Sequence, residues 1–179
     1  MRDLDLDEVR FVPTGDPPHR PDPALPSEVR AEMVRRMIAG RPGFVLSRAE
    51  LDRRGPSYTA DTIEAFAAAE PDADLWILLG ADQLATFDRW RDPERILARA
   101  RIAAAARGEA DADLVARDAE RLAPGRVDLI RMPRVNVSST DIRRRLRAGE
   151  PVSGLLPPGV EPVLRAASDT GAPATLDRT

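Results

Sequence analysis

Short apolar runs alternate with amphipathic segments along this chain, a pattern typical of a mostly parallel α/β sheet. The run 75–79 is continuously apolar, as expected for a strand that is covered on both faces. Ser27, Thr59 and Ser138 each precede a segment with helical features, so we expect each to cap a helix. The alanine-rich run 102–106 fits either a strand or a helix, and we favour the strand. The pattern predicts strands over 9–13, 44–47, 75–79, 102–106 and 127–131, and helices over 27–39, 59–69, 93–100, 113–122, 138–148 and 160–167.

Length and composition indicate one globular domain. The chain has 179 residues, of which 42% are hydrophobic and 32% are charged, and this balance is that of an ordinary folded domain. We see no internal repeat and no second domain, and we predict a single domain over residues 1–167. The last residues, 168–179, are small, polar and proline-containing, which predicts a disordered tail.

Several classes of protein are excluded by what the sequence lacks. It has no cysteine and a single histidine, His19, which excludes disulfides, thiolate metal sites and multi-histidine clusters. No apolar run is long enough to span a membrane and no signal-peptide core follows Met1, so we expect a cytoplasmic protein that does not enter the membrane. The net charge of −3 is not the strongly positive charge that is typical of nucleic-acid-binding proteins. The basic residues are all arginine, which excludes a P-loop lysine.

The segment 137–143, Val-Ser-Ser-Thr-Asp-Ile-Arg, is a candidate anion site. It places hydroxyl groups and backbone N–H groups at the N-terminus of a helix, where anions bind readily. Arg143 stands in the first turn, where a cation opposes the helix dipole, and a bound anion would explain its placement. The alternative is a serine cap followed by a solvated arginine face with Asp141 as a local partner. Spacing alone favours neither interpretation.

Three further loops carry candidate chemistry. Gly80 and Asp82 follow the buried strand, where an aspartate can bind ribose hydroxyls, although a simple helix cap is the favoured alternative. Trp90 comes just before a helix and could stack on a ring, but core packing is the commoner role of such a residue. His19 lies in a proline-rich loop, where it could contact phosphate or be solvated.

The order of these motifs along the chain is more informative than any one of them. The sequence contains, in this order, Pro17-Pro-His-Arg20, Pro56-Ser-Tyr-Thr59, Leu79-Gly-Ala-Asp82, Phe87-Asp-Arg-Trp90, Val137-Ser-Ser-Thr-Asp-Ile-Arg143 and Leu155-Leu-Pro-Pro-Gly-Val160. This order resembles the bacterial nicotinate-nucleotide adenylyltransferases of NAD synthesis, from Asp7 to about Ala167. The resemblance implies a Rossmann-like nucleotidylyltransferase fold, with a parallel sheet and helices on both faces.

The resemblance also implies a reaction and a set of binding residues. Adenylyl transfer from ATP to nicotinate mononucleotide would give nicotinate-adenine dinucleotide and pyrophosphate, with Mg²⁺ accompanying ATP. No covalent intermediate is expected, so catalysis would consist of positioning and charge neutralisation. The residues expected to bind ATP and its phosphates are Ser138, Ser139, Thr140, Arg143 and His19, with Arg20 nearby. The residues expected to bind the mononucleotide are Tyr58, Thr59, Gly80, Asp82, Trp90 and Arg91.

One part of the family pattern, the N-terminal strand and Gly-Gly-Thr-Phe-Asp-Pro-x-His-x-Gly-His loop, does not occur in this sequence. None of the family's catalytic histidines is therefore present. The missing strand would be central to the sheet, and its absence would leave two inner strand edges unpaired. We expect the true start to lie upstream of Met1, with roughly 20 further residues forming one strand, loop and helix. The intact mass of the protein from its own cells tests this expectation.

Other interpretations remain open at this stage. The chain could be a non-catalytic nucleotide-binding module, or an adenylyltransferase for another mononucleotide, such as the amidated pyridine or a pantetheine phosphate. The sequence also leaves the oligomeric state open, with a homo-oligomer as one alternative.

Overall fold

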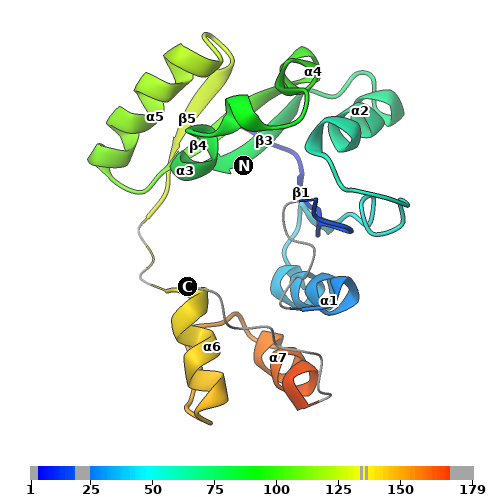
Figure 1. Cartoon of the computed structure of the whole chain (residues 1–179), viewed down its shortest axis with the longest axis vertical. Helices are drawn as coiled ribbons and strands as arrows, with labels where there is room; N and C mark the ends of the chain where they lie inside the picture. The colour runs from blue at the N-terminus through cyan, green and yellow to red at the C-terminus, as the bar shows by residue number, and fades with distance from the viewer. Residues whose placement is uncertain (1–3, 19–24, 134, 136, 170–179) are drawn as a thin grey trace. The chain divides into compact units, whose positions relative to one another are not determined.

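The computed structural model describes residues 4–18, 25–133, 135 and 137–169. The chain divides into two compact units, which we call unit 1 (Met1–Ser57 with Asn136–Thr179) and unit 2 (Tyr58–Val135). Figure 1 shows the helices and strands of both units. The prediction of a single domain over 1–167 is not tested by this division and stays a prediction.

Unit 1 contains a two-stranded parallel sheet together with helices, one of which packs against the sheet. The pairing begins at Val9 opposite Phe44, and the rings of Phe11 and Phe44 lie 5.4 Å apart between centroids. One helix, α1, packs against both β2 and α7. The elements of unit 1 are β1 (Val9–Phe11), α1 (Ser27–Ile38), β2 (Phe44–Leu46), α6 (Ser139–Arg147) and α7 (Val160–Asp169).

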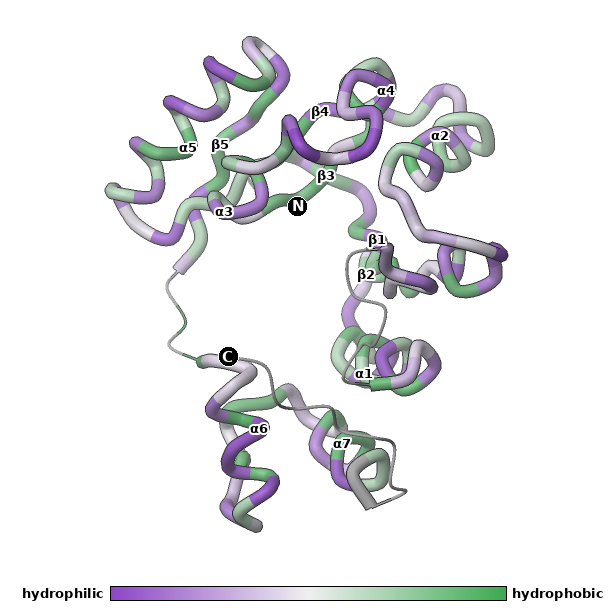
Figure 2. The backbone as a smooth tube through the Cα atoms, in the orientation of Figure 1, coloured by the Kyte–Doolittle hydropathy of each residue, from purple (hydrophilic) through white to green (hydrophobic). Residues whose placement is uncertain are grey.

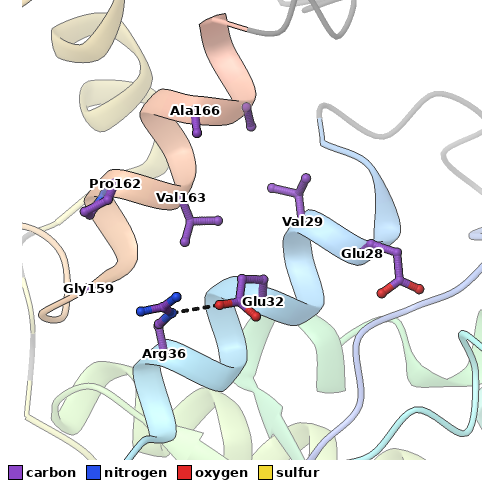
Figure 3. A pocket seen from close by; sticks show the side chains of 9 residues that line it. Glu28, Val29, Glu32, Arg36, Gly159, Pro162, Val163 and Ala166 are labelled. Atoms are coloured by element: carbon purple, nitrogen blue, oxygen red, sulfur yellow. Dashed lines mark hydrogen bonds and ion pairs between the residues drawn. The ribbon is translucent and has the colours of Figure 1, made fainter.

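A groove lies between α1 and α7 (Figure 3). Its floor is apolar, with Val29 from α1 and Val163 and Ala166 from α7, and its volume is about 610 Å³. Glu32 and Arg36 stand on one side as an ion pair, with Arg36 Nε 2.7 Å from Glu32 Oε1. The groove is therefore a seam between two amphipathic helices with charges at its rim.

Unit 2 contains a three-stranded parallel sheet in the order β3–β4–β5. The apolar strand β3 runs directly into a short helix, because Gly80 is at once its last residue and the N-cap of α3. The elements of unit 2 are α2 (Thr59–Ala69), β3 (Leu75–Gly80), α3 (Ala81–Leu84), a 3₁₀ turn (Phe87–Arg89), α4 (Pro93–Arg99), β4 (Ala100–Ala106), α5 (Glu109–Leu122) and β5 (Val127–Arg131).

One face of this sheet forms the core of unit 2. Ile77, Ile102 and Val127 stand in register across the three strands and belong to the core or pack against it. Figure 2 shows β3 as a mainly hydrophobic strand. The central strand β4 ends in four consecutive alanines, all at most 8% exposed. Helices α3, α4 and α5 pack against β4. The buried core residues are Ala60, Leu79, Leu84, Phe87, Ile96, Ile102, Ala104, Ala106, Val115 and Ala123.

The alternate residues of the same strands point to the other face and carry a polar network. Trp76 Nε1 donates to Asp128 Oδ2 at 2.8 Å, and Arg101 donates to both oxygens of Asp128 at 2.8 Å. The Arg101 guanidinium, followed by the Trp76 indole, holds the pKa of the Asp128 carboxyl below its ordinary value. This network joins side chains from all three strands and so helps to fix their register.

The α/β class and the parallel pairing predicted from the sequence are confirmed. Within the described residues the strands pair as two separate parallel sheets, one in each unit, in keeping with the expectation that two inner strand edges are left unpaired. The run 102–106 is a strand. Helix α5 begins at Glu109, four residues before the predicted start. Ser27 and Thr59 are wrong as caps, because each is the first helical residue and the caps are Pro26 and Tyr58.

Candidate nucleotide-binding site

The predicted phosphate-binding residues lie at the N-terminus of α6 in unit 1. Ser138 is the N-cap, and its Oγ accepts a hydrogen bond from the backbone N–H of Asp141 at 3.0 Å. Ser138, Ser139 and Thr140 are all exposed, whereas Ile142 is buried and anchors the helix. The serine and threonine hydroxyls thus stand on a helix terminus whose inner face is held by an apolar residue.

The arginines of α6 do not have equivalent surroundings. Arg144 donates to Asp141 Oδ1 at 2.7 Å and Arg145 donates to Asp141 Oδ2 at 2.8 Å. These two bonds, that of Arg144 first, lower the pKa of the Asp141 carboxyl. Arg143 instead donates to Thr140 Oγ1 at 3.3 Å, and among the described residues it forms no ion pair. The alternative of a solvated face with Asp141 as partner therefore fits Arg144 and Arg145 but not Arg143.

The predicted mononucleotide-binding residues all lie in unit 2. Tyr58 is the N-cap of α2 in an extended conformation, and it makes no side-chain cap hydrogen bond. Thr59 is the first helical residue and is partly buried. The first turn of α2 therefore has no side-chain cap from Tyr58, and its N–H groups are suited to an anion.

Arg91 extends this group of residues. Its guanidinium carbon lies 4.2 Å from the centroid of the Tyr58 ring, a cation–π geometry. The interaction with the Tyr58 side chain raises the pKa of Arg91. Trp90, directly before it, is half-buried, with its ring 5.6 Å from that of Phe87 at 51°. Trp90 is thus anchored on the core on one side, and its partial exposure leaves room for a stacking role.

Gly80 and Asp82 lie together at the carboxyl end of β3. A Cβ on Gly80 would come within 2.7 Å of Asp82 Oδ1, so the missing side chain lets the carboxylate fold back over the strand end. Asp82 is exposed, and its other oxygen accepts a bond from Gln83 at 3.4 Å. This is the position at which parallel sheets bind ligands.

His19 and Arg20 lie outside the described residues. The structure therefore brings together Tyr58 with Arg91 and Gly80 with Asp82 inside unit 2, and separately the residues of the α6 terminus inside unit 1.

The residues that support the loop after β1 were not predicted from the sequence. Ser57 is 8% exposed, and its Oγ accepts bonds from the N–H groups of Gly15 and Asp16, each at 3.2 Å. A Cβ on Gly15 would lie 2.1 Å from the carbonyl oxygen of Glu50, so only glycine fits there. The signal was present, because Ser57 belongs to the motif that also carries Tyr58.

Arg30 is a second missed support. It donates from Nη2 to the carbonyl of Thr14 at 2.5 Å and from Nε to the carbonyl of Leu25 at 3.3 Å. Burial lowers the pKa of Arg30, with Glu50 acting in the opposite direction. One guanidinium therefore binds the chain on both sides of the proline-rich loop.

Comparison with known proteins identifies the family. Residues 1–145 match the cytidylyltransferase-like family model. A nicotinate-nucleotide adenylyltransferase of Nocardioides sp. is 42% identical over 158 residues, which cover 88% of this chain and 76% of the relative. The chain belongs to the nicotinate-nucleotide adenylyltransferase family. Another member, from Symbiobacterium thermophilum, is 39% identical over 89% of this chain and 77% of its own length.

Solved adenylyltransferases of this kind share the fold. The nicotinic acid mononucleotide adenylyltransferase of Plasmodium falciparum, complexed with NaAD, matches with a TM-score of 0.66 over 96% of this chain and 85% of its own. The same enzyme complexed with APC gives a TM-score of 0.65. At 15% and 14% identity these likenesses show the fold alone.

In the ranges that the structure describes, no helix is long and apolar enough to cross a bilayer.

Proposed function

We propose that this protein transfers the adenylyl group of ATP to nicotinate mononucleotide, giving nicotinate-adenine dinucleotide and pyrophosphate in NAD synthesis. The observation that carries the proposal is the 42% identity, over most of both chains, to a relative named for this activity. A cytoplasmic location is part of the proposal, because ATP is supplied in that compartment.

The chemistry requires positioning more than bond-making by the protein. The phosphate of the mononucleotide attacks the α-phosphorus of ATP, a new phosphorus–oxygen bond forms, and the bond to the β-phosphate breaks as pyrophosphate leaves. The protein has to hold two anionic substrates in line and neutralise their charge. Helix N-termini and arginines are the groups that do this, and each unit supplies one such helix with an arginine beside it.

We assign the two substrates to the two units. Ser138, Ser139, Thr140 and Arg143 are proposed to bind the phosphates of ATP, because Arg143 is the α6 arginine that Asp141 does not engage. In unit 2, Thr59 and Tyr58 are proposed to bind the nicotinate carboxylate at the α2 terminus, where the N-cap Tyr58 makes no side-chain cap hydrogen bond.

The remaining residues of unit 2 are assigned to the rest of the mononucleotide. Trp90 is proposed to stack on the pyridine ring, with Arg91 beside the Tyr58 ring. Gly80 and Asp82 are proposed to contact the ribose, because they stand at the carboxyl end of β3. His19, outside the described residues, is proposed to lie near the phosphates on the resemblance alone.

Mg²⁺ is proposed to enter with ATP as part of the substrate. Among the described residues no group of three or more His, Cys, Asp or Glu side chains could hold a metal ion. Mg²⁺ is commonly held by one or two carboxylates together with substrate phosphates, so the protein needs no dedicated cage. When bound, the ion would neutralise part of the phosphate charge.

The proposal is tested on the protein isolated from its own cells. With MgATP and nicotinate mononucleotide we expect nicotinate-adenine dinucleotide and pyrophosphate in equal amounts. The amidated mononucleotide and pantetheine phosphate are the matched substrates, and faster turnover of either would overturn the choice of substrate. Calorimetric binding of the mononucleotide with no pyrophosphate release would overturn transfer in favour of a binding module.

A further inference from the structure

Arg95 of α4 is the centre of an ion network to which the assigned residues give no role. Its Nη1 donates to Asp92 Oδ2 at 2.9 Å and its Nη2 to Asp61 Oδ1 at 3.3 Å. Its Nε and Nη2 donate to the two oxygens of Glu64 at 3.0 and 2.5 Å. Three carboxylates thus meet one guanidinium, which ties α2 to α4.

Two of these carboxylates belong to the helix that is proposed to bind the nicotinate carboxylate. Asp61 lies in the first turn of α2, two residues after Thr59, and Glu64 lies less than one turn further on. A side-chain carboxylate in the first turn interacts favourably with the helix dipole, and so does a ligand carboxylate bound at the same helix terminus. The two negative charges, however, repel each other. The Arg95 guanidinium holds the pKa of Glu64 below its ordinary value, so Glu64 stays ionised. Arg95 therefore supplies charge compensation that an anion at this terminus needs.

The third carboxylate belongs to the segment that carries the ring-stacking residue. Asp92 has a φ of +50°, a left-handed conformation that is strained for a residue with a side chain. It is the N-cap of α4 but makes no side-chain cap hydrogen bond, and its carboxylate binds Arg95 instead. Trp90 and Arg91 come directly before Asp92. A fixed Asp92 backbone therefore also fixes the direction in which the chain at Trp90 and Arg91 enters helix α4.

We propose that Arg95 is a positioning residue that makes the N-terminus of α2 selective for an acidic ring substituent. It acts through Asp61 and Glu64, whose charge it compensates, and through Asp92, whose strained backbone it holds in place. This inference rests on the proposed function, because it takes the nicotinate carboxylate as the anion at α2. It predicts that loss of Arg95 weakens binding of the acid more than binding of the amide.

The experiment measures dissociation constants by calorimetry for nicotinate mononucleotide, its amide and ATP. For Arg95→Met we expect about a fivefold weaker affinity for the acid, in the range of an exposed ion-pair network, with the affinities for the amide and ATP within about twofold. The loss should shrink as salt is raised, since charges near the surface are screened over about 8 Å at physiological ionic strength. Arg95→Lys keeps the charge and should restore most of the acid affinity.

A matched control is Arg121→Met. Arg121 also forms exposed ion pairs inside unit 2, with Asp118 at 3.0 Å and Asp88 at 3.5 Å. Its substitution by methionine removes the same single positive charge as Arg95→Met. We expect it to leave the preference for the acid unchanged. An equal loss of preference in this control would overturn the proposal in favour of net charge.

A second variant keeps the test independent of the folding of Arg95→Met. In Asp61→Asn with Glu64→Gln the repelling charges are gone, so the preference for the acid should persist or increase, and adding Arg95→Met should then cost less than it does alone. An unchanged cost, or equal weakening for acid and amide, would mean a purely structural role. A wild-type protein with no preference for the acid would instead contradict the proposed substrate.

Discussion

Ser138 caps α6, whereas the N-cap of α2, Tyr58, makes no side-chain cap hydrogen bond. Helix α6 also carries several arginines, and Asp141 of its first turn binds two of them. The α2 terminus has acidic residues on its own helix, and its compensating charge comes from Arg95 of another helix. The proposed anion site of α6 therefore depends on residues of one helix, whereas the proposed anion site of α2 depends on packing between two helices.

The largest expected effect concerns Trp90 in unit 2. Trp90→Ala removes the proposed stacking surface and should weaken binding of nicotinate mononucleotide by about tenfold or more, the range of ring–aromatic stacking. The affinity for ATP should change by less than about twofold. Calorimetry with both ligands makes the measurement, and Trp90→Phe, which keeps a ring, should recover much of the loss. A parallel fall in ATP affinity would contradict the assignment of one substrate to each unit.

Arg143→Gln is the corresponding change in unit 1. Loss of a charge-assisted hydrogen bond to phosphate should weaken ATP binding by about tenfold and leave the mononucleotide unaffected. The control is Arg147→Gln, one turn further along the same helix, in its last turn. We expect no change in ATP affinity there. Equal effects at both positions would indicate a diffuse positive field in place of a phosphate contact.

Thr59→Val removes a hydroxyl while keeping the shape of the side chain. We expect about a fivefold weaker affinity for nicotinate mononucleotide, the cost of one hydrogen bond. Because Thr59 is not the cap of α2, the midpoint of thermal unfolding should stay the same. A lower midpoint together with unchanged binding would show that the hydroxyl serves the helix instead of the ligand.

Ser138→Ala makes the opposite comparison, because Ser138 does cap its helix. Here we expect a loss of about 1 kcal/mol in the free energy of unfolding, the usual cost of a missing cap. ATP affinity should fall only a few-fold, because Ser139 and Thr140 remain. Urea titration measures the first effect and calorimetry the second. Unchanged stability would mean that the cap in α6 is dispensable.

The smallest effect is a pH dependence on the other face of the unit 2 sheet. Arg101 and Trp76 lower the pKa of Asp128 in the folded protein, so this carboxylate stabilises the fold above its ordinary pKa of 3.8 and loses that contribution as the pH falls below it. The difference in unfolding midpoint between wild type and Asp128→Asn should be constant from neutral pH to about pH 5 and vanish in stronger acid. A difference that grows on acidification would have the wrong sign.

The sequence predicts local elements well where a signal stands at each end. Pro71 follows α2, and its bounds agree with the prediction. Helix α5 begins earlier than predicted. Its N-cap is Gly108, with a φ of 134°, and the small and acidic residues that follow have no apolar period to indicate that a helix begins there. The short helix α3 has too few residues for any period. For the alanine run the sequence favours a strand without excluding a helix, and the pairing with β3 and β5 decides between them.

The candidate site shows the same division between local and tertiary information. The α6 terminus could be predicted from consecutive residues, because Ser138 and Arg143 lie within one motif. The role of Arg95 could not, because it depends on the packing of α4 against α2, more than 30 residues away in the chain. The cap at Tyr58 was missed for a related reason: the extended backbone, and not the hydroxyl of Thr59, determines where that helix begins.

The alanines of β4 also constrain how this protein can change over evolutionary time. Ala104 and Ala106 are buried in the core, and helices α3, α4 and α5 pack against their strand. A larger residue at Ala104 would overpack the core, whereas a smaller residue at Leu84, in the same core, would leave a cavity. The two changes are therefore coupled, and each is better tolerated when the other is present.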